Sequence, residues 1–372
     1  MSGPAVDYVL PLRWAADRDP GDLDELTDYL AWLRDRTRVI VVDASADPLF
    51  AHHARAWAGL ADHLRPDADV DFANGKVTGV LTGLRRARSA YVIIADDDVR
   101  YDDRSLRAVA RLLGAADLVR PQNYFDPAPW HARWDTARTL INRAIGADYP
   151  GTFGIRRDSF DAMGGYDGNV LFENLELIRT VRAYGGSERR PLGLYVRRLP
   201  PDARRFWGQR VRQAYDDIAQ PARMAIFLAM LPALAAVVAR RGPRAGAVGA
   251  AAAAAAAIGV AEAGRRRAGG AQVFPATAAL FAPGWVLERG ICVWPALAAR
   301  LCRGGIVYAG RRIRRAAHSV RELSRDPRRP ERGSRRAYAN HHKTASFRTG
   351  RTGTTPPSGV QPRSAGRPGS AA

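Results

Sequence analysis

Three consecutive aspartates, Asp96, Asp97 and Asp98, follow the short apolar segment Tyr91–Ala95. In an extended chain, the side chains of Asp96 and Asp98 lie on the same side, because successive residues alternate between the two faces of a strand. Carboxylate oxygens are ligands that Mg²⁺ and Mn²⁺ prefer, and proteins commonly hold these ions together with substrate phosphates. The pattern therefore favours a divalent cation, held by Asp96 and Asp98, that binds a diphosphate.

The same aspartates also have a purely structural interpretation. Aspartate clusters often cap the helix that follows them, and Asp102, Asp103 and Ser105 precede a helical pattern that begins at Leu106. Short acidic motifs also occur by chance. The cation site therefore depends on whether nearby residues offer the other groups that a nucleotide diphosphate needs.

Two further segments offer such groups. Asp43 ends an apolar run and is a candidate acceptor of hydrogen bonds from a nucleobase or a ribose, with the capping of a turn as the alternative. Asn74-Gly75-Lys76 begins a helical pattern, where backbone amides and a lysine can contact phosphate oxygens, although Asn-Gly also forms simple turns. Lys76 and Lys343 are the only lysines in an arginine-rich sequence, which points to a specific role for Lys76.

The elements that must position these residues alternate along the chain. Short runs rich in Val, Ile and Tyr predict buried strands, and periodic apolar residues between them predict helices. The expected strands are Val6–Leu12, Arg38–Asp43 and Tyr91–Ala95, and the expected helices are Leu23–Arg34 and Val77–Arg88. This alternation predicts an α/β fold with a mostly parallel sheet and ligands at the carboxyl ends of the strands.

The composition predicts a folded protein with a basic C-terminal end. Of the 372 residues 47% are hydrophobic, the two cysteines show no metal-ligand spacing, and no secretory signal precedes the first strand. The formal net charge is +20. Residues 303–372 carry about 17 Lys or Arg and about 3 acidic residues. Because the first two hundred residues are nearly balanced in charge, no binding of nucleic acid is expected.

Apolar segments in the C-terminal half predict contact with a membrane. Ala222–Ala239 and Ala245–Ala263 approach the length that spans hydrocarbon, although the second is so rich in alanine that a buried helical hairpin is the alternative. Phe274–Leu301 is interrupted by prolines and favours a re-entrant or interfacial segment. Beyond about Ser319 the composition predicts a disordered cytoplasmic tail attracted to anionic lipid.

The order of these residues resembles the family 2 glycosyltransferases of GT-A fold, in particular the membrane-anchored members. The resemblance covers roughly Val6 to Gln213. Its motifs are Val-Val-Asp43-Ala-Ser, Asn74-Gly75-Lys76, Asp96-Asp97-Asp98 at the place of Asp-x-Asp, Gly164-Gly165-Tyr166-Asp167 at the place of Gly-Gly-Phe-Asp, Phe172-Glu173-Asn174-Leu175-Glu176-Leu177 at the start of a helix, and Gln209-Arg210-Val211-Arg212-Gln213 at the place of Gln-x-x-Arg-Trp.

The resemblance implies an inverting enzyme at the cytoplasmic face of the cell membrane. It would move a sugar from a nucleotide-sugar donor to a hydroxyl acceptor, lipid-linked or glycan, with Mg²⁺ or Mn²⁺ held by Asp96 and Asp98. Arg210 and Arg212 would stabilise the departing diphosphate, or alternatively pair with lipid phosphates. The implied donor-binding residues are Asp43, Lys76, Asp96, Asp97, Gln209, Arg210 and Arg212.

Two positions depart from the family pattern. Asn174 stands where the family has its catalytic Asp, and an amide cannot take up the acceptor's proton. Glu173 and Glu176 share a helical face, so we expect Glu173, and after it Glu176, to be the base, while the other complements the helix dipole. Gln213 replaces Trp, which weakens stacking on an acceptor sugar. Asn174 also supports a rival hypothesis, a membrane-anchored nucleotide-sugar-binding or scaffold protein that has lost catalysis.

The predicted domain organisation has three parts. Residues 1–205 form the transferase domain, residues 206–302 form amphipathic and transmembrane or interfacial helices, and residues 303–372 form the basic tail. His52-His53 lacks a carboxylate or cysteine at ligand spacing, so no metal role is expected for this pair.

Overall fold

The computed structural model describes residues 5–15 and 19–325 of the chain, and most of the predicted tail lies outside these residues. Within them, seven strands form a central sheet in the order β3-β2-β1-β4-β8-β6-β9. Strands β3, β2, β1 and β4 run parallel, β8 is antiparallel to both of its neighbours, and β9 is parallel to β6. The strands are β1 Val6–Leu12, β2 Arg38–Asp43, β3 Asp62–Leu64, β4 Tyr91–Ala95, β6 Leu118–Val119, β8 Thr152–Arg156 and β9 Glu188–Arg189. The predicted α/β fold with a mostly parallel sheet is confirmed.

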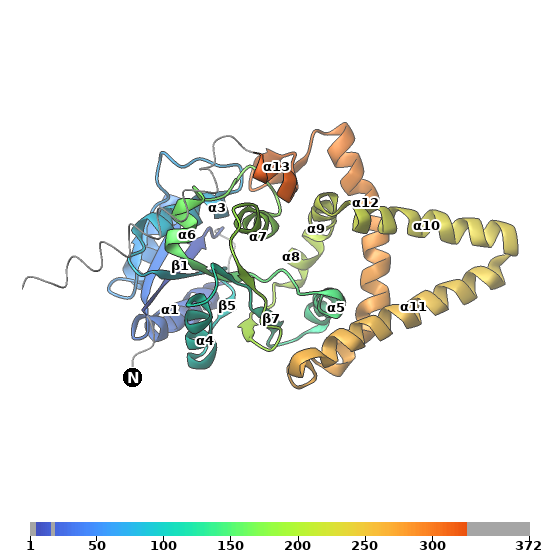
Figure 1. Cartoon of the computed structure of the whole chain (residues 1–372), viewed down its shortest axis with the longest axis horizontal. Helices are drawn as coiled ribbons and strands as arrows, with labels where there is room; N and C mark the ends of the chain where they lie inside the picture. The colour runs from blue at the N-terminus through green and yellow to red at the C-terminus, as the bar shows by residue number, and fades with distance from the viewer. Residues whose placement is uncertain (1–4, 16–18, 326–372) are drawn as a thin grey trace, which may run out of the picture. The chain divides into compact units, whose positions relative to one another are not determined.

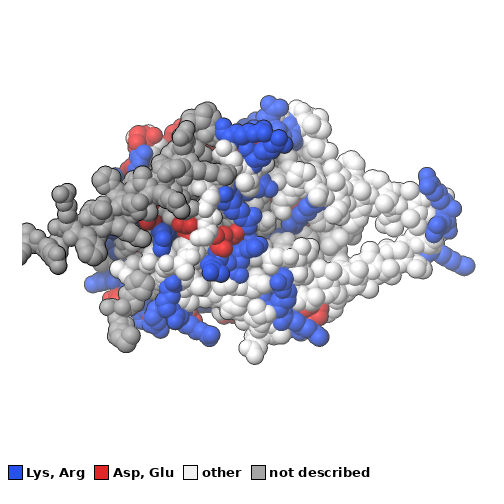
Figure 2. Space-filling model, in the orientation of Figure 1, with Lys and Arg blue, Asp and Glu red and all other residues white. Residues whose placement is uncertain are grey.

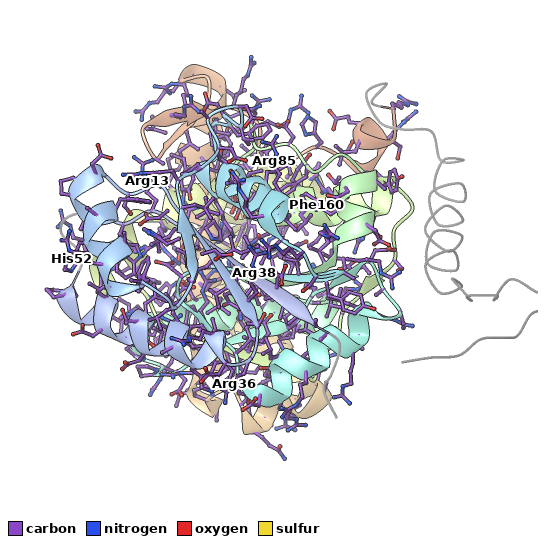
Figure 3. All side chains as sticks on the ribbon, turned by 90° about the vertical axis from the view of Figure 1, so that its left-hand side faces the viewer. Arg13, Arg36, Arg38, His52, Arg85 and Phe160 are labelled. Atoms are coloured by element: carbon purple, nitrogen blue, oxygen red, sulfur yellow. The ribbon has the colours of Figure 1, made fainter. Side chains whose placement is uncertain are left out.

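Helices cover both faces of this sheet, as the view in Figure 3 shows. Tyr8 and Leu10 of β1 pack with α1, α2 and α4 on one face, whereas Val9 packs with α3, α6 and α7 on the other. This division follows from the alternation of side chains along a strand. The helices are α1 Pro20–Arg34, α2 Asp47–Ala56, α3 Gly75–Arg86, α4 Asp103–Leu113, α5 Trp130–Ile145, α6 Arg157–Ala162 and α7 Glu173–Ala183.

A smaller sheet lies beside the carboxyl end of β4. It joins β5 Val99–Arg100, β10 Tyr195–Arg198 and β7 Gln122–Phe125, with β10 antiparallel to β5 and parallel to β7. In this register Arg198 pairs with Val99, the residue after Asp98. The arrangement brings the end of β10 next to the acidic cluster.

The C-terminal part is helical and packs on α5. Its elements are α8 Ala203–Gly208, α9 Arg210–Tyr215, the 3₁₀ helices η1 Asp216–Ala219, η2 Arg267–Gln272 and η3 Ala276–Phe281, and the helices α10 Pro221–Arg241, α11 Pro243–Arg266 and α12 Ala282–Cys302. A third apolar cluster joins α5, α9, α10, α11 and α12, with Leu140, Phe227 and Trp285 among its members. The C-terminal helices therefore share a core with the domain that carries the sheet.

Helices α10 and α11 form a hairpin that projects from this core (Figure 1). Within the described residues, these two helices are long and apolar enough to cross a membrane, and only 11% of each apolar window is buried. Figure 2 shows mostly uncharged arms and a basic tip, at which Arg240, Arg241 and Arg244 lie. The alternative of a buried hairpin does not fit this exposure. The segment expected to be re-entrant or interfacial contains α12, which buries Trp285 and Val293 in the core and exposes Leu287, Ile291 and Trp294.

Residues 303–325, which the sequence analysis assigns to the tail, are folded. They form β11 Ile306–Tyr308, β12 Arg311–Ile313 and α13 Val320–Ser324. The buried side chain of Ile313 joins the apolar core, and the backbone amides of Leu171 and Phe172 donate to the carbonyls of Arg315 and Ala316. These contacts hold the segment against the start of α7.

Candidate functional site

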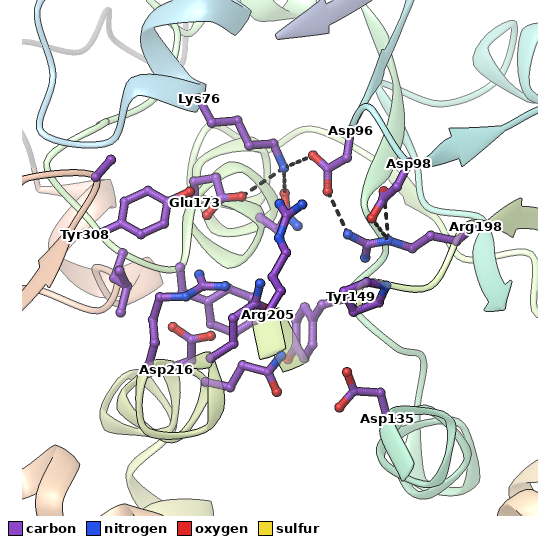
Figure 4. Close-up of a pocket in the computed structure, with 18 of the residues that line it drawn as sticks. Lys76, Asp96, Asp98, Asp135, Tyr149, Glu173, Arg198, Arg205, Asp216 and Tyr308 are labelled. Atoms are coloured by element: carbon purple, nitrogen blue, oxygen red, sulfur yellow. Dashed lines mark hydrogen bonds and ion pairs between the residues drawn. The ribbon is translucent and has the colours of Figure 1, made fainter. Parts of the chain in front are cut away.

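A cavity of ≈340 Å³ lies at the carboxyl ends of β1 and β4, bounded also by α3, α7 and the C-terminal helices (Figure 4). Among the described residues, seven acidic and eight basic side chains line it, so it suits a polar and charged ligand. The acidic residues are Asp96, Asp97, Asp98, Asp135, Glu173, Asp216 and Asp217, and the basic ones are Arg13, Lys76, Arg138, Arg198, Arg205, Arg212, Arg223 and Arg289.

The three aspartates after β4 all line this cavity. The backbone N–H of Asp96 donates to the carbonyl of Gly151 at 2.8 Å, and a Cβ atom on Gly151 would lie 2.6 Å from Oδ2 of Asp96. A glycine is therefore needed there for the carboxylate to sit as it does. The helix cap predicted as an alternative role comes from Asp102, which forms a capping box with Ser105 at the start of α4. The cluster is thus not used to cap the helix.

Arg198 joins two of these aspartates. Its Nε lies 2.9 Å from both carboxylate oxygens of Asp98, and its Nη2 lies 3.3 Å from Oδ2 of Asp96. Burial raises the pKa of Asp98, and the nearby charges of Asp96 and Asp97 raise it further, against the opposing effect of Arg198. The pKa of Asp98 is thus raised mainly by burial, to which the neighbouring carboxylates add.

Lys76 lies between two carboxylates at the start of α3. Its Nζ is 2.5 Å from Oδ1 of Asp96 and 2.9 Å from Oε1 of Glu173. Burial disfavours the charged lysine, but the two carboxylates raise its pKa above the ordinary value. Asn74 caps the helix by accepting from the N–H of Lys76, and it donates to Oε2 of Glu173 at 3.4 Å. Glu173 is thus already engaged by an ammonium and an amide.

Gln209, Arg210 and Arg212 are expected to bind the diphosphate, but only part of this set reaches the cavity. Gln209 and Arg212 line the cavity, and the guanidinium of Arg212 lies 5.2 Å from the ring centroid of Tyr308 in β11. Arg210 does not line it. Its side chain is buried and ion-paired with Asp135 at 2.7 Å and Glu288 at 3.5 Å. The structure therefore brings Arg212, but not Arg210, to the other expected site residues.

Asp43 lies next to the cavity with its side chain buried. Its Oδ2 accepts hydrogen bonds from Nδ1 of His53 at 2.7 Å and Nε2 of His63 at 3.0 Å, while Oδ1 accepts from the N–H of Ser45. Burial would raise the pKa of Asp43, but these hydrogen bonds lower it below the ordinary value. The neighbouring Ala44, rather than Asp43, lines the cavity.

Asp43, His53 and His63 also form a cluster able to hold a metal ion. The expectation that His53 lacks a carboxylate companion is therefore wrong, because α2 and β3 bring two histidines from ten and twenty residues away onto Asp43. Both histidine nitrogens lie at hydrogen-bond distance from Oδ2 of Asp43, and the three ligand atoms lie within 4.8 Å of one another. In the structure the cluster acts as a hydrogen-bonded support for the end of β2.

The second expected base candidate lies elsewhere. Glu176 is fully buried and is not among the residues that line the cavity. Its Oε2 accepts from the backbone N–H of His318 at 2.7 Å, and its Oε1 lies 2.9 Å from Nδ1 of the same residue. Asn174 does line the cavity, with its amide donating to the carbonyl of Pro150 at 3.0 Å. Glu176 thus helps to hold the segment that follows β12.

Asp96 and Asp98 offer the oxygen ligands that a hard divalent cation takes. Arg198 occupies the same oxygens that such an ion would share. The donor set therefore fits Mg²⁺ or Mn²⁺, in competition with the guanidinium of Arg198.

Sequence reasoning missed several residues of the cavity, among them Arg198, Tyr308 and Asp216. Arg198 and Tyr308 reach it only through the pairing of β10 with β5 and through the return of the chain after α12. For Asp216, by contrast, the sequence itself holds a pattern that could have identified it. Gln209, Gln213 and Asp216 follow one another at spacings of four and three residues, which place them on one helical face, and all three line the cavity.

No family model matches the sequence and no curated protein matches it. Solved structures similar to it include a mannosyltransferase from Pyrobaculum calidifontis in complex with GDP-mannose and Mn²⁺, with 20% identity, TM-score 0.44, and coverage of 78% of this chain and 87% of that one. Another is glucosyl-3-phosphoglycerate synthase from Mycobacterium tuberculosis with Mn²⁺, UDP and glucosyl-3-phosphoglycerate, with 14% identity, TM-score 0.40, and coverage of 55% and 75%. Mannosyl-3-phosphoglycerate synthase from Rubrobacter xylanophilus has 19% identity, TM-score 0.38, and coverage of 56% and 74%.

Proposed function

We propose that this protein is a glycosyltransferase that moves a sugar from a nucleotide-sugar donor to a hydroxyl acceptor. The observation that carries the proposal is the meeting of Asp96 and Asp98 with Lys76 and Arg212 in one cavity. Paired carboxylates suit a divalent cation, and the basic side chains suit the diphosphate of the donor and of the leaving group. A GT-A fold and an inverting reaction, which the sequence resemblance implies, belong to the proposal.

Basic side chains on opposite sides of the cavity would contact the phosphates of the donor. Among the described residues, no carboxylate lies within ion-pair distance of Arg205 or Arg212, so both have charge to offer to phosphate oxygens. Lys76 is held between Asp96 and Glu173, where it can contact the same phosphates from the opposite side. A cation bound to Asp96 and Asp98 would supply charge that stabilises the departing diphosphate.

An amphiphilic acceptor at the cytoplasmic face of a membrane is part of the proposal. Another cavity, of ≈450 Å³, shares Asn142, Tyr149, Gln220 and Arg223 with the charged one. Its walls include Ile226 and Phe227, at the base of the projecting α10. A lipid-linked acceptor fits this geometry, because its apolar part would lie in the second cavity while its hydroxyl reaches the first.

Thermal-shift measurements of the purified protein against UDP-, GDP- and dTDP-sugars, each with and without Mn²⁺, test the proposal. We expect stabilisation by one nucleotide class, larger with Mn²⁺, and turnover that Asp98→Ala abolishes. Asp103→Ala is the matched control, because this half-exposed aspartate pairs with Arg36 outside the cavity. The proposal is abandoned if no nucleotide sugar stabilises or reacts with the wild-type protein.

The rival function is a nucleotide-sugar-binding or scaffold protein that has lost catalysis. Asn174 supports it, because an amide stands where the resemblance places the catalytic carboxylate. Donor binding without turnover in the presence of candidate acceptors would favour this rival. Turnover would exclude it.

A further inference from the structure

Asp216 is an acidic residue of the cavity that neither the sequence motifs nor the donor site uses. It begins η1, directly after α9, and lines the cavity with Arg212 and Gln213. Figure 4 draws it on the other side of the cavity from Asp98 and Arg198. It therefore faces the space between the cation ligands and the C-terminal helices, where an acceptor approaching from the second cavity would enter.

One carboxylate oxygen of Asp216 has a free hydrogen-bonding position. Its Oδ1 is shielded from solvent and accepts no hydrogen bond from the residues that the structure describes. Buried polar atoms are nearly always paired, so an unpaired carboxylate oxygen in a cavity calls for a ligand donor. The hydroxyl group of a substrate is such a donor.

The charges around Asp216 suit the uptake of a proton. Burial raises its pKa to about 7, with Glu173 on α7 and Asp217 on η1 raising it and Arg212 on α9 and Arg289 on α12 lowering it. Arg138 on α5 also faces this charge. A carboxylate whose pKa lies near the working pH is both populated and basic enough to take a proton in the transition state.

The other acidic candidates are less suited to this role. Glu173 is held by the ammonium of Lys76 at 2.9 Å and by the amide of Asn74, so both of its oxygens already have partners. Glu176 is bound to His318 outside the cavity lining. Asn174 has no proton-accepting carboxylate. Asp217 also lines the cavity and has an oxygen without a hydrogen bond, but its carboxylate is ion-paired with Arg223 at 3.1 Å and with Arg289 at 3.5 Å. Asp216 has an oxygen without a hydrogen bond and, among the described residues, no ion pair.

We propose that Asp216 is the base that takes the proton of the acceptor hydroxyl group. As the acceptor oxygen forms its bond to the anomeric carbon, its proton passes to a carboxylate oxygen of Asp216. The bond between the anomeric carbon and the phosphate oxygen breaks, and its electron pair leaves with the nucleoside diphosphate. The proton then returns to solvent. This inference rests on the proposed glycosyltransferase function.

The test compares Asp216→Asn with Asp161→Asn in steady-state kinetics on the donor that the thermal-shift screen identifies. Asp161 is a matched control, because burial also raises its pKa but it lies on α6 outside the cavity. We expect Asp216→Asn to lower kcat by about 100-fold or more while KM for the donor changes by less than about threefold. The wild-type kcat should rise with pH and level off above about 7, the value of the pKa of Asp216. Asp216→Glu should recover part of the rate and keep this acid limb.

The outcomes separate the inference from the function on which it rests. If the wild type neither binds nor turns over a nucleotide sugar, the proposed function and the role of Asp216 are both rejected. If it is active and Asp216→Asn retains its rate, or loses rate with the acid limb near pH 7 intact, the inference alone is overturned. Loss of that limb in Asp216→Asn, with unchanged donor binding by calorimetry, supports the inference. The same loss in Glu173→Gln but not in Asp216→Asn would give the role to Glu173 instead.

Discussion

The Nε of Arg198 lies 2.9 Å from both carboxylate oxygens of Asp98, so an internal cation occupies the ligands expected to hold a metal ion. The guanidinium also reaches Asp96 at 3.3 Å and therefore touches both halves of the expected cation site. Binding of Mg²⁺ or Mn²⁺ would have to displace this side chain, at least in part. The apparent affinity for the ion then includes the cost of that displacement.

Replacing Arg198 with Gln should tighten the binding of Mn²⁺ in the absence of nucleotide. The change removes the competing charge from Asp96 and Asp98 and leaves Lys76 on Asp96, so we expect an affinity gain of about three- to tenfold, since each tenfold is about 1.4 kcal/mol. Arg197→Gln on the same strand is the control, because Arg197 pairs with Asp126 instead. Titration calorimetry with MnCl₂ measures both variants. Weaker binding in Arg198→Gln would show that the guanidinium organises the site rather than competing for it.

Replacing Lys76 with Met should weaken donor binding by about 10- to 100-fold, the scale of one or two charge-assisted hydrogen bonds. The change removes the positive charge between Asp96 and Glu173, and both carboxylates would then repel the diphosphate. Lys76→Arg keeps the charge and serves as the comparison. Calorimetric titration with the nucleotide sugar is the measurement. Equal affinity in Lys76→Met and the wild type would remove Lys76 from the donor site.

The raised pKa of Asp216 also predicts how the stability of the fold depends on pH. The native state favours the protonated carboxyl, so this group is neutral to stability below its unfolded pKa and increasingly destabilising as pH rises toward its folded pKa of about 7. Asp216→Asn should therefore unfold at a temperature about 2 to 4 °C above the wild type at pH 8.5, and at the same temperature near pH 4. Asp24→Asn on α1, an exposed carboxyl, controls for the change of charge. If the unfolding temperatures of Asp216→Asn and the wild type differed equally at pH 4 and pH 8.5, the pKa of Asp216 would not be raised in the folded protein.

Shortening the α10–α11 hairpin tests its proposed contact with a membrane. Replacing residues 232–254 with a short Gly-Ser turn removes the exposed apolar arms and leaves the buried contacts of Met224, Phe227 and Ala261 in place. We expect the shortened protein to leave the vesicle fraction in flotation on phosphatidylcholine and phosphatidylglycerol, while the donor still raises its Tm. Retention on vesicles would place membrane binding outside the hairpin arms.

A single methyl group should disturb the junction between α11 and α5. A Cβ on Gly264 would lie 1.9 Å from the carbonyl oxygen of Leu140, so the two backbones would have to move apart. Gly264→Ala should lower the free energy of unfolding by about 1–3 kcal/mol. Gly259→Ala, on the same helix with no atom within 4 Å of its Cβ position, should be neutral or slightly stabilising. Denaturant unfolding in detergent compares them, and equal stability would mean that α11 does not pack on α5 this closely.

The sequence predicted the central strands well because their signal is local. The three expected strands coincide with β1, β2 and β4, and the two expected helices agree with α1 and α3 within three residues at each end. Continuous apolar runs between turn residues allow few alternatives for buried parallel strands. The rule that ligands bind at the carboxyl ends of the strands agrees with the position of Asp96, which lines the cavity, whereas Asp43, expected at the same edge, does not line it.

The site residues that the sequence placed less well depend on partners far along the chain. Glu176 shares a helical face with Glu173, but its oxygens bind His318, 142 residues later. Arg210 is drawn into the core by Asp135 and Glu288. Such pairings follow from how helices pack on one another, which periodicity does not determine. The spacing of Gln209, Gln213 and Asp216 is a local pattern that would have predicted their shared helical face.

The return of the chain after α12 has a consequence for biosynthesis. Tyr308 and Ala309 close one wall of the charged cavity, although they follow the projecting hairpin in the sequence. A nascent chain therefore cannot complete this wall until the hairpin has left the ribosome. The charged cavity can therefore be completed only after both apolar arms of the hairpin have been synthesised.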